Sequence, residues 1–183
     1  MRIGILRIGT VEPYVLSRIK EGLSNIFPET KCTLIGDELP VLEEAFNENR
    51  RQYDSTIILH VVHSYAERKK IFNRILGVTE VDLFVPRLNF VFGEAECPGR
   101  VAIISLHRLR PEFYGEKPNL EVFVERCLKE AVHELGHTLG LRHCPNPFCV
   151  MHFSNSIFDT DTKQSLFCNK CYLKVNDLLK KLE

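Results

Sequence analysis

The letters HELGHTLGLRH at residues 133–143 constrain the fold of this chain more than any other part of its sequence. The residues before them are apolar at helical intervals and include no glycine or proline, which predicts a helix over residues 121–139. On such a helix His133 and His137 lie on the same face, separated by about 6 Å along the axis. Two neutral imidazoles at this spacing can bind one Zn²⁺ ion, which prefers nitrogen or sulfur ligands in a tetrahedral arrangement.

The rest of the motif completes a predicted catalytic zinc site. Gly140 can adopt a positive φ, so the helix can end there and the chain can bring His143 to the ion from another side. Three protein ligands leave a fourth position for water, which is typical of a catalytic rather than a structural zinc. Glu134 would lie beside the ion and act as a general base on that water. Gly136 costs the helix about 1 kcal/mol, and we interpret it as room for close packing beneath the metal.

Four of the seven cysteines predict a second metal site, of a structural kind. In a reducing compartment, two short-range cysteine pairs indicate metal binding rather than disulfides. Four thiolates make a closed tetrahedral site with no open position, which would join the loop after His143 to the last helix. Buried free thiols and an iron–sulfur cluster are the alternatives. The predicted ligands are Cys144, Cys149, Cys168 and Cys171.

The motif and the cysteines resemble one protein family. The HExxHxxGxxH pattern followed by Met151 is similar to that of the metzincin clan of zinc peptidases. The spacing of the four cysteines resembles one branch of that clan, the archaemetzincins. Residues 77–83, 88–95 and 149–156 also look like this family, so the resemblance covers nearly the whole chain.

The resemblance implies an α/β (α+β), metzincin-like single domain over residues 1–183. Its parts would be a twisted mixed sheet with an antiparallel edge strand, an active-site helix and a small zinc-bound C-terminal subdomain. The N-terminal subdomain would span residues 1–140, and the C-terminal one residues 141–183. Met151 would form the Met-turn, an apolar floor beneath the histidines, with an ordinary core methionine as the alternative.

The resemblance also implies that the edge strand lies above the metal, where an extended peptide can dock by strand addition. A plain structural strand is the alternative. We assign this role to Asn89, Phe90, Val91, Phe92, Gly93 and Glu94.

Patterns elsewhere predict the remaining elements. A strand, a helix and a strand at the start suggest parallel pairing through a right-handed crossover. Residues 37–54 are polar and charged, and we expect a long excursion or flexible loop, which could overhang a cleft but is more typical of a solvated surface. His107 and Tyr114 are candidates for stabilising an oxyanion, whereas His60 and His63 are more typical of ordinary helix residues. The predicted strands are 2–9, 31–35, 81–85, 90–95 and 100–106, and the predicted helices are 14–27, 55–76 and 172–182.

Composition limits the cellular setting. With 44% hydrophobic and 26% charged residues, the 183-residue chain has the make-up of a soluble globular domain. A formal net charge of zero gives no reason to expect nucleic acid or an anionic membrane as a partner. The N-terminus lacks a signal-peptide pattern, and no apolar run reaches the roughly 20 residues that span a bilayer. We therefore expect a cytoplasmic protein, and a monomer.

These observations predict a zinc metallopeptidase that binds two Zn²⁺ ions per chain, one catalytic and one structural. Its partner would be a peptide or protein substrate, and Glu134 would be the general base. A zinc-stabilised binding module with little or no turnover is the alternative from another class. A nucleic-acid-binding zinc ribbon is a second alternative, but the lysines that support it are better explained as a solvated face. Those lysines are Lys163, Lys170, Lys174, Lys180 and Lys181.

Overall fold

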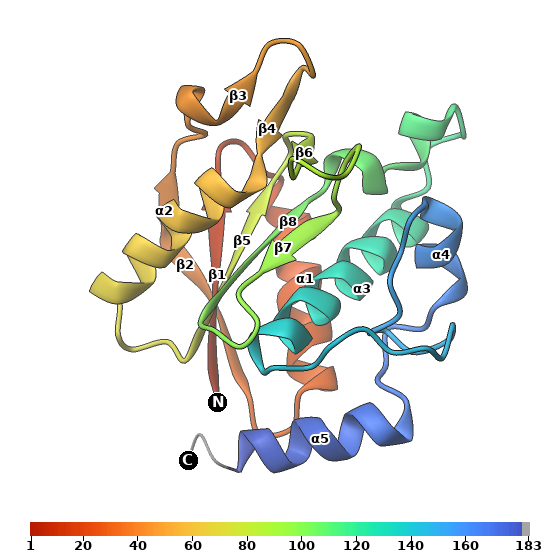
Figure 1. The fold of residues 1–183 in the computed structure, drawn as a ribbon. Coiled ribbons are helices and arrows are strands. Elements are labelled where there is room, and N and C mark those ends of the chain that lie inside the picture. Colours follow the sequence, from red (N-terminus) through yellow and green to blue (C-terminus); the bar gives the residue numbers. More distant parts are fainter. Residues whose placement is uncertain (181–183) are drawn as a thin grey trace.

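A five-stranded mixed sheet forms the centre of the structure, a computed structural model that describes residues 1–180 (Figure 1). The strand order is β2-β1-β5-β8-β7, in which the first four strands are parallel and β7 is antiparallel at one edge. The mixed α/β single domain with an antiparallel edge strand is therefore confirmed. Its strands are β1 (Arg2–Ile8), β2 (Lys31–Leu39), β5 (Arg74–Thr79), β8 (Val101–Ser105) and β7 (Gly93–Ala95).

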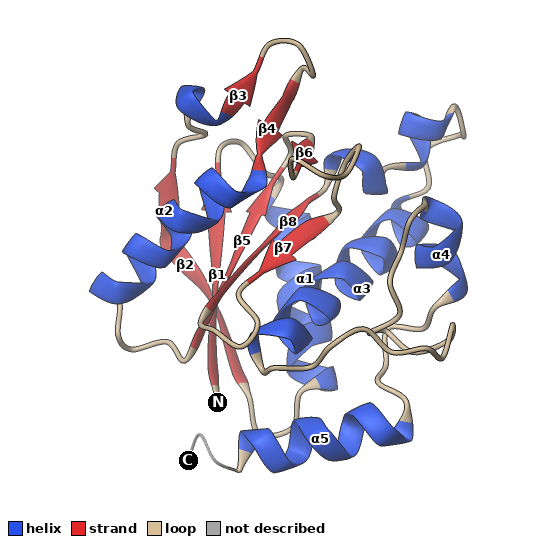
Figure 2. Cartoon of the chain, viewed as in Figure 1, coloured by secondary structure: helices blue, strands red, loops and turns tan. Residues whose placement is uncertain are grey.

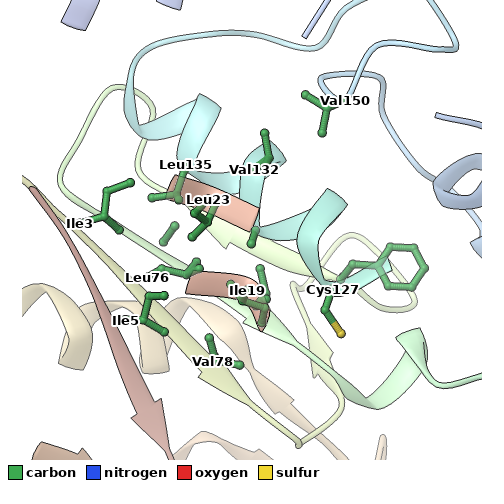
Figure 3. Close-up of a cluster of buried hydrophobic side chains, with 14 of the residues drawn as sticks. Ile3, Ile5, Ile19, Leu23, Leu76, Val78, Cys127, Val132, Leu135 and Val150 are labelled. Carbon is green, nitrogen blue, oxygen red and sulfur yellow. The ribbon is translucent and has the colours of Figure 1, made fainter. Parts of the chain in front are cut away.

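Helices cover both faces of the sheet, and each face has its own hydrophobic cluster (Figure 2). Helices α1 and α3 cover one face, where Leu23 lies near Leu135 and Ile19 belongs to the same buried cluster (Figure 3). Helix α2 covers the opposite face through Ile58 and Val62. Burying a side chain of this size contributes roughly 1.5–3 kcal/mol, so the two clusters hold the layers together. The helix bounds are α1 (Pro13–Ile26), α2 (Ser55–Arg68) and α3 (Leu120–Thr138).

The predicted helix over residues 55–76 is wrong in its second half. Helix α2 begins after Asp54, whose side chain accepts a hydrogen bond from the Thr56 N–H at 2.9 Å, but it ends eight residues early. The chain then forms strand β5, in which Ile75 and Leu76 face opposite hydrophobic clusters. A strand covered on both faces is apolar throughout, so no alternation distinguishes it from a buried helix.

Residues 37–54, predicted as a flexible excursion, instead contain the end of strand β2 and, at residues 46–54, a hairpin in a second, three-stranded sheet. The turn of this hairpin depends on Asn47, whose C=O accepts from the Arg51 N–H at 2.8 Å and whose Oδ1 accepts from the Arg50 N–H at 3.1 Å. Very short strands with polar side chains lack the apolar alternation by which strands are recognised. The strands of this sheet are β3 (Phe46–Asn47), β4 (Gln52–Asp54) and β6 (Leu83–Phe84).

The C-terminal part packs on α3 through charged groups and through apolar side chains such as Met151 and Ile157, which share the buried cluster of α3. The guanidinium of Arg126 donates two hydrogen bonds of 2.7 Å to the carboxylate of Asp161, in α4 (Ile157–Thr162). Helix α5 (Asn169–Leu179) begins three residues before the predicted helix, whose residues 181 and 182 lie outside the described part of the chain. The division into subdomains at residue 140 stays a prediction. Across residues 1–180, no helix has the length and apolar character needed to cross a membrane.

Candidate active site

Helix α3 presents the motif, and its two ends explain why it is helical here. At the start, the Asn119 side chain caps the helix by accepting from the Val122 N–H at 3.1 Å. At the end, Gly140 has a φ of +90°, and its N–H donates to the His137 C=O at 2.7 Å. The positive φ predicted for Gly140 is therefore confirmed, and the reversed chain carries His143 back toward the helix.

The structure brings His133, His137 and His143 together. One ring nitrogen from each lies within 4.8 Å of the others, and Nε2 of His133 is 3.1 Å from Nε2 of His137. Nδ1 of His133 is 2.7 Å from the Val150 C=O, and Nδ1 of His137 is 2.7 Å from the Leu141 C=O. Because a carbonyl only accepts, both Nδ1 atoms carry the proton, and both Nε2 atoms present lone pairs to the same point.

The charge state of the rings also suits a metal. Burial lowers the pKa of His133 well below its ordinary value, and it lowers the pKa values of His137 and His143 as well. The rings are therefore neutral near pH 7, which is the form that binds a metal ion.

Glu134 lies beside this centre and against the edge strand. Its side chain is 5% exposed and lines the cleft above the histidines. A Cβ added at Gly93 would be 2.6 Å from the Ile103 C=O oxygen, 2.7 Å from Glu134 Cγ and 2.8 Å from Glu134 Oε1, so only a glycine fits between this backbone and Glu134. Burial, with the nearby Glu130 and Glu94 carboxylates, raises the pKa of Glu134 well above its ordinary value.

A cleft of about 340 Å³ opens over the three histidines. Its floor is the face of α3 that carries Glu130, His133, Glu134 and His137 at helical spacing. One wall is residues 85–95, and the other is Phe153, Ser154 and Asn155.

The edge strand is shorter than predicted. Of the six residues assigned to it, only Gly93 and Glu94 belong to β7. The carbonyl of Asn89 is taken by side chains of the β3–β4 hairpin, and the N–H of Val91 donates to Leu83 at 2.9 Å. All six nevertheless line the cleft, so the stretch Asn89, Phe90, Val91, Phe92, Gly93 and Glu94 forms its wall, partly as loop.

The outer edge of β7 has a definite orientation. The Phe92 C=O accepts from the Ser105 N–H at 2.8 Å, and the Glu96 N–H donates to the Val101 C=O at 3.1 Å. Residues of an antiparallel pair alternate in the direction of their backbone groups, so Gly93 and Ala95 turn theirs away from β8.

Met151 is completely buried beneath the helix that carries the histidines. A Cβ added at Gly136 would clash with Met151 Sδ, so the interpretation of Gly136 as room for packing is confirmed. The Met151 C=O accepts from the Cys144 N–H at 2.8 Å. This contact ties the turn at Met151 to the segment that follows His143.

The four cysteines also come together. Their sulfurs lie within 4.8 Å of one another, and Cys144 Sγ is 3.8 Å from Cys168 Sγ, too far for a disulfide. The Cys168 N–H donates to Cys149 Sγ at 3.3 Å. The backbone N–H of Cys171 lowers the pKa of Cys168 to about 7, which favours its thiolate.

Neither candidate for the oxyanion lies at this site, and several residues that line the cleft were not predicted from the sequence. The Tyr114 hydroxyl donates to the Arg108 C=O at 2.8 Å and the His107 ring packs on Phe113, so neither candidate for the oxyanion lines the cleft. Glu130 was not anticipated, although its place three residues before His133 puts it on the same helix face.

A helix-borne His-Glu pair, a third histidine after a glycine turn and an antiparallel strand over the cleft together define the class as a metallopeptidase of the metzincin type. The model of peptidase family M54 matches residues 17–177. The archaemetzincin of Methanocaldococcus jannaschii is 46% identical over 178 residues, which cover 97% of this chain and 94% of the relative. The archaemetzincin of Pyrococcus abyssi is 47% identical over 174 residues, which cover 93% of this chain and 92% of the relative.

A solved structure supports the same family. The crystal structure of the archaemetzincin of Methanopyrus kandleri superposes with a TM-score of 0.86 at 36% identity, over 98% of this chain and 96% of that one. The chain belongs to peptidase family M54, the archaemetzincins. The predicted family and the predicted class of zinc metallopeptidase are therefore confirmed.

Proposed function

We propose that His133, His137 and His143 hold a catalytic zinc ion and that the chain hydrolyses peptide bonds there. The observation that carries this proposal is the 3.1 Å approach of His133 Nε2 to His137 Nε2. Two nitrogens about 2.05 Å from a tetrahedral zinc ion would lie roughly 3.3 Å apart, close to the distance found. Two neutral lone pairs would otherwise repel each other, so their convergence fits a shared cation.

When bound, zinc supplies a Lewis acid that polarises the scissile carbonyl and makes water more acidic. Glu134 then accepts a proton from the attacking water and transfers it to the leaving amine. A divalent cation at the neighbouring rings favours the ionised carboxylate, which opposes the raised pKa of Glu134 caused by burial. The absence of a side chain at Gly93 leaves Glu134 the space it needs at the cleft floor.

The substrate is an extended peptide that adds to the outer edge of β7. The N–H and C=O groups of Gly93 and Ala95 turn away from β8, and they border the cleft beside Glu134. Hydrogen bonds of this kind fix the peptide's direction without depending on its side chains. Strand addition therefore positions the scissile carbonyl over the three histidines.

The four cysteines hold a second, structural zinc ion. Sulfurs 2.3 Å from a tetrahedral zinc would lie about 3.8 Å apart, the same as the distance between Cys144 Sγ and Cys168 Sγ. Cys144 directly follows His143 in the chain, so fixing its sulfur also fixes the third histidine. Residues 141–180 pack on α3 through buried apolar side chains such as Met151 as well as through charged groups, and metal binding there supports their folding.

A peptide-library assay with matched variants tests the mechanism. We expect Glu134→Gln to bind as much zinc as the wild type and to cleave nothing, because an amide cannot take the proton. Glu121→Gln on the same helix is the control, since Glu121 is exposed and lies far from the motif in sequence. Retained cleavage by Glu134→Gln would refute the general-base role. A zinc-loaded wild type that binds peptides but cleaves none would favour the binding-module alternative.

A further inference from the structure

The β3–β4 hairpin reaches one wall of the cleft without lining the cleft itself. No residue of 37–54 borders the cleft in the described chain, yet the Arg50 side chain crosses to the cleft loop at residues 85–91. Its Nη2 donates to the Leu88 C=O at 2.7 Å and to the Asn89 C=O at 2.9 Å. Its guanidinium also lies over the Phe84 ring, 4.3 Å from the centroid.

Gln52 makes a second contact between the hairpin and the same loop. Its Nε2 donates to the Asn89 C=O at 3.0 Å and to Asp82 Oδ2 at 3.0 Å, and its Oε1 accepts from Arg50 Nε at 3.0 Å. Both side chains therefore meet at the carbonyl of Asn89, and the side chain of Gln52 is buried. An arginine can make these contacts together because its donors form a rigid, planar fork.

Apart from these contacts and the hydrogen bond from the Val91 N–H to the Leu83 C=O at 2.9 Å, few groups fix the loop. Its own turn is a hydrogen bond from the Leu88 N–H to the Val85 C=O at 3.0 Å, and strand β6 before it has only two residues. The far end is held by Arg108, which lies 4.4 Å from the centroid of the Phe90 ring and forms an ion pair with Asp82 at 2.7 Å. The hairpin is thus what holds the middle of the loop.

The held segment is the apolar wall of the cleft. Val85, Leu88, Phe90 and Val91 all line it, and Leu88 is 39% exposed, so its side chain is available to a ligand. The wall and the three histidines line the same cleft, and we place the peptide's reacting bond over the histidines. A side chain next to that bond would pack on it and bury apolar surface.

We infer that the β3–β4 hairpin, through Arg50 and Gln52, positions this wall so that the site selects an apolar side chain beside the scissile bond. Arg50 is a positioning residue, since it acts on the substrate only through Leu88 and Asn89. The inference rests on the proposed zinc peptidase function. A loop already held in place needs no ordering when the ligand binds, and this preorganisation is the source of the affinity.

Hydroxamate binding to the zinc-loaded protein tests the inference separately from catalysis. Acetohydroxamate reports the metal site alone, while two peptidyl hydroxamates with a leucine or an alanine side chain report the wall. We expect the wild type to bind the leucine probe about tenfold more tightly than the alanine probe. Arg50→Ala should reduce this ratio to about threefold or less, with acetohydroxamate binding unchanged.

Two further variants complete the test. Arg51→Ala is the matched control, because Arg51 is exposed, adjacent in the same turn, and should keep the full ratio. Arg50→Lys keeps the charge but not the fork, so it should behave like Arg50→Ala even if the alanine variant folds poorly. An unchanged ratio in both Arg50 variants, with normal acetohydroxamate binding, would overturn the inference. Failure of acetohydroxamate to bind the wild type would instead refute the metal site.

Discussion

The ion pair between Lys163 and Glu130 offers a sharp test of how the cleft floor is held. Lys163 Nζ lies 2.9 Å from Glu130 Oε1, and the two side chains are 0% and 3% exposed, so the prediction that Lys163 lies on a solvated face is wrong. The geometry falls outside that of a hydrogen bond, so charge is the main attraction, while Thr160 Oγ1 donates to the same oxygen at 3.1 Å. Glu130 borders the cleft one helical turn before Glu134.

Lys163→Met should lower the free energy of unfolding by about 3–5 kcal/mol, because it leaves a buried carboxylate without its counter-charge. Adding Glu130→Gln should recover most of this loss, to within about 2 kcal/mol of the wild type. The amide is neutral and still accepts from Thr160. Urea unfolding of the two single variants and the double variant, all with excess zinc, measures the coupling between the sites.

The exposed pair Arg18–Glu21 supplies the control. Arg18 Nε lies 3.6 Å from Glu21 Oε2, and the two side chains are 49% and 68% exposed. Glu21→Gln should therefore change the free energy of unfolding by about 0.5 kcal/mol or less. The reasoning from burial would be refuted if Lys163→Met lowered the free energy of unfolding by less than about 1 kcal/mol. It would also be refuted if the double variant were as unstable as Lys163→Met alone.

Two other substitutions test the site from different sides. Gly93→Ala should lower kcat at least about tenfold at unchanged zinc content, because the new Cβ would be 2.6 Å from the Ile103 C=O and 2.7 Å from Glu134 Cγ. Gly36→Ala is the control, because its new Cβ would meet nothing within 4 Å. Equal kcat values for the two variants in steady-state kinetics would contradict this prediction. Cys168→Ser should lower the zinc content of the protein. It should also lower Tm, by about 2–4 °C for each kcal/mol of unfolding free energy that is lost. Metal analysis and calorimetry against Cys32→Ala check this, and unchanged values would argue against the four-thiolate site.

The groups of the candidate site could be predicted because their spacing is local. A helix fixes the relation of His133 to His137, and Gly140 permits the turn that returns His143, so three residues of one short segment meet without long-range information. The cysteines could be paired by the same local spacing. The position of Glu130 on the same helix face follows from that geometry. No sequence pattern, however, marks a carboxylate three residues before the motif as part of the cleft.

Features that depend on tertiary contacts could not be predicted in this way. Strand β5 is apolar because helices cover both faces of the sheet, and a sequence run of this kind does not distinguish strand from helix. The edge strand begins only at Gly93 because Val91 pairs with Leu83 and the Asn89 C=O is taken by the hairpin. The role of Arg50 could not be predicted either, because its acceptors, the Leu88 and Asn89 carbonyls, are 38 and 39 residues away in sequence.

The number of zinc ions per chain is the most direct test of the central claim, that three imidazoles and four thiolates form two separate metal sites. Metal analysis of the purified wild type should give two zinc ions, and His143→Ala should give about one, with the cysteine site still filled. A wild type with a single zinc ion, whose content is unaffected by His143→Ala, would contradict the account.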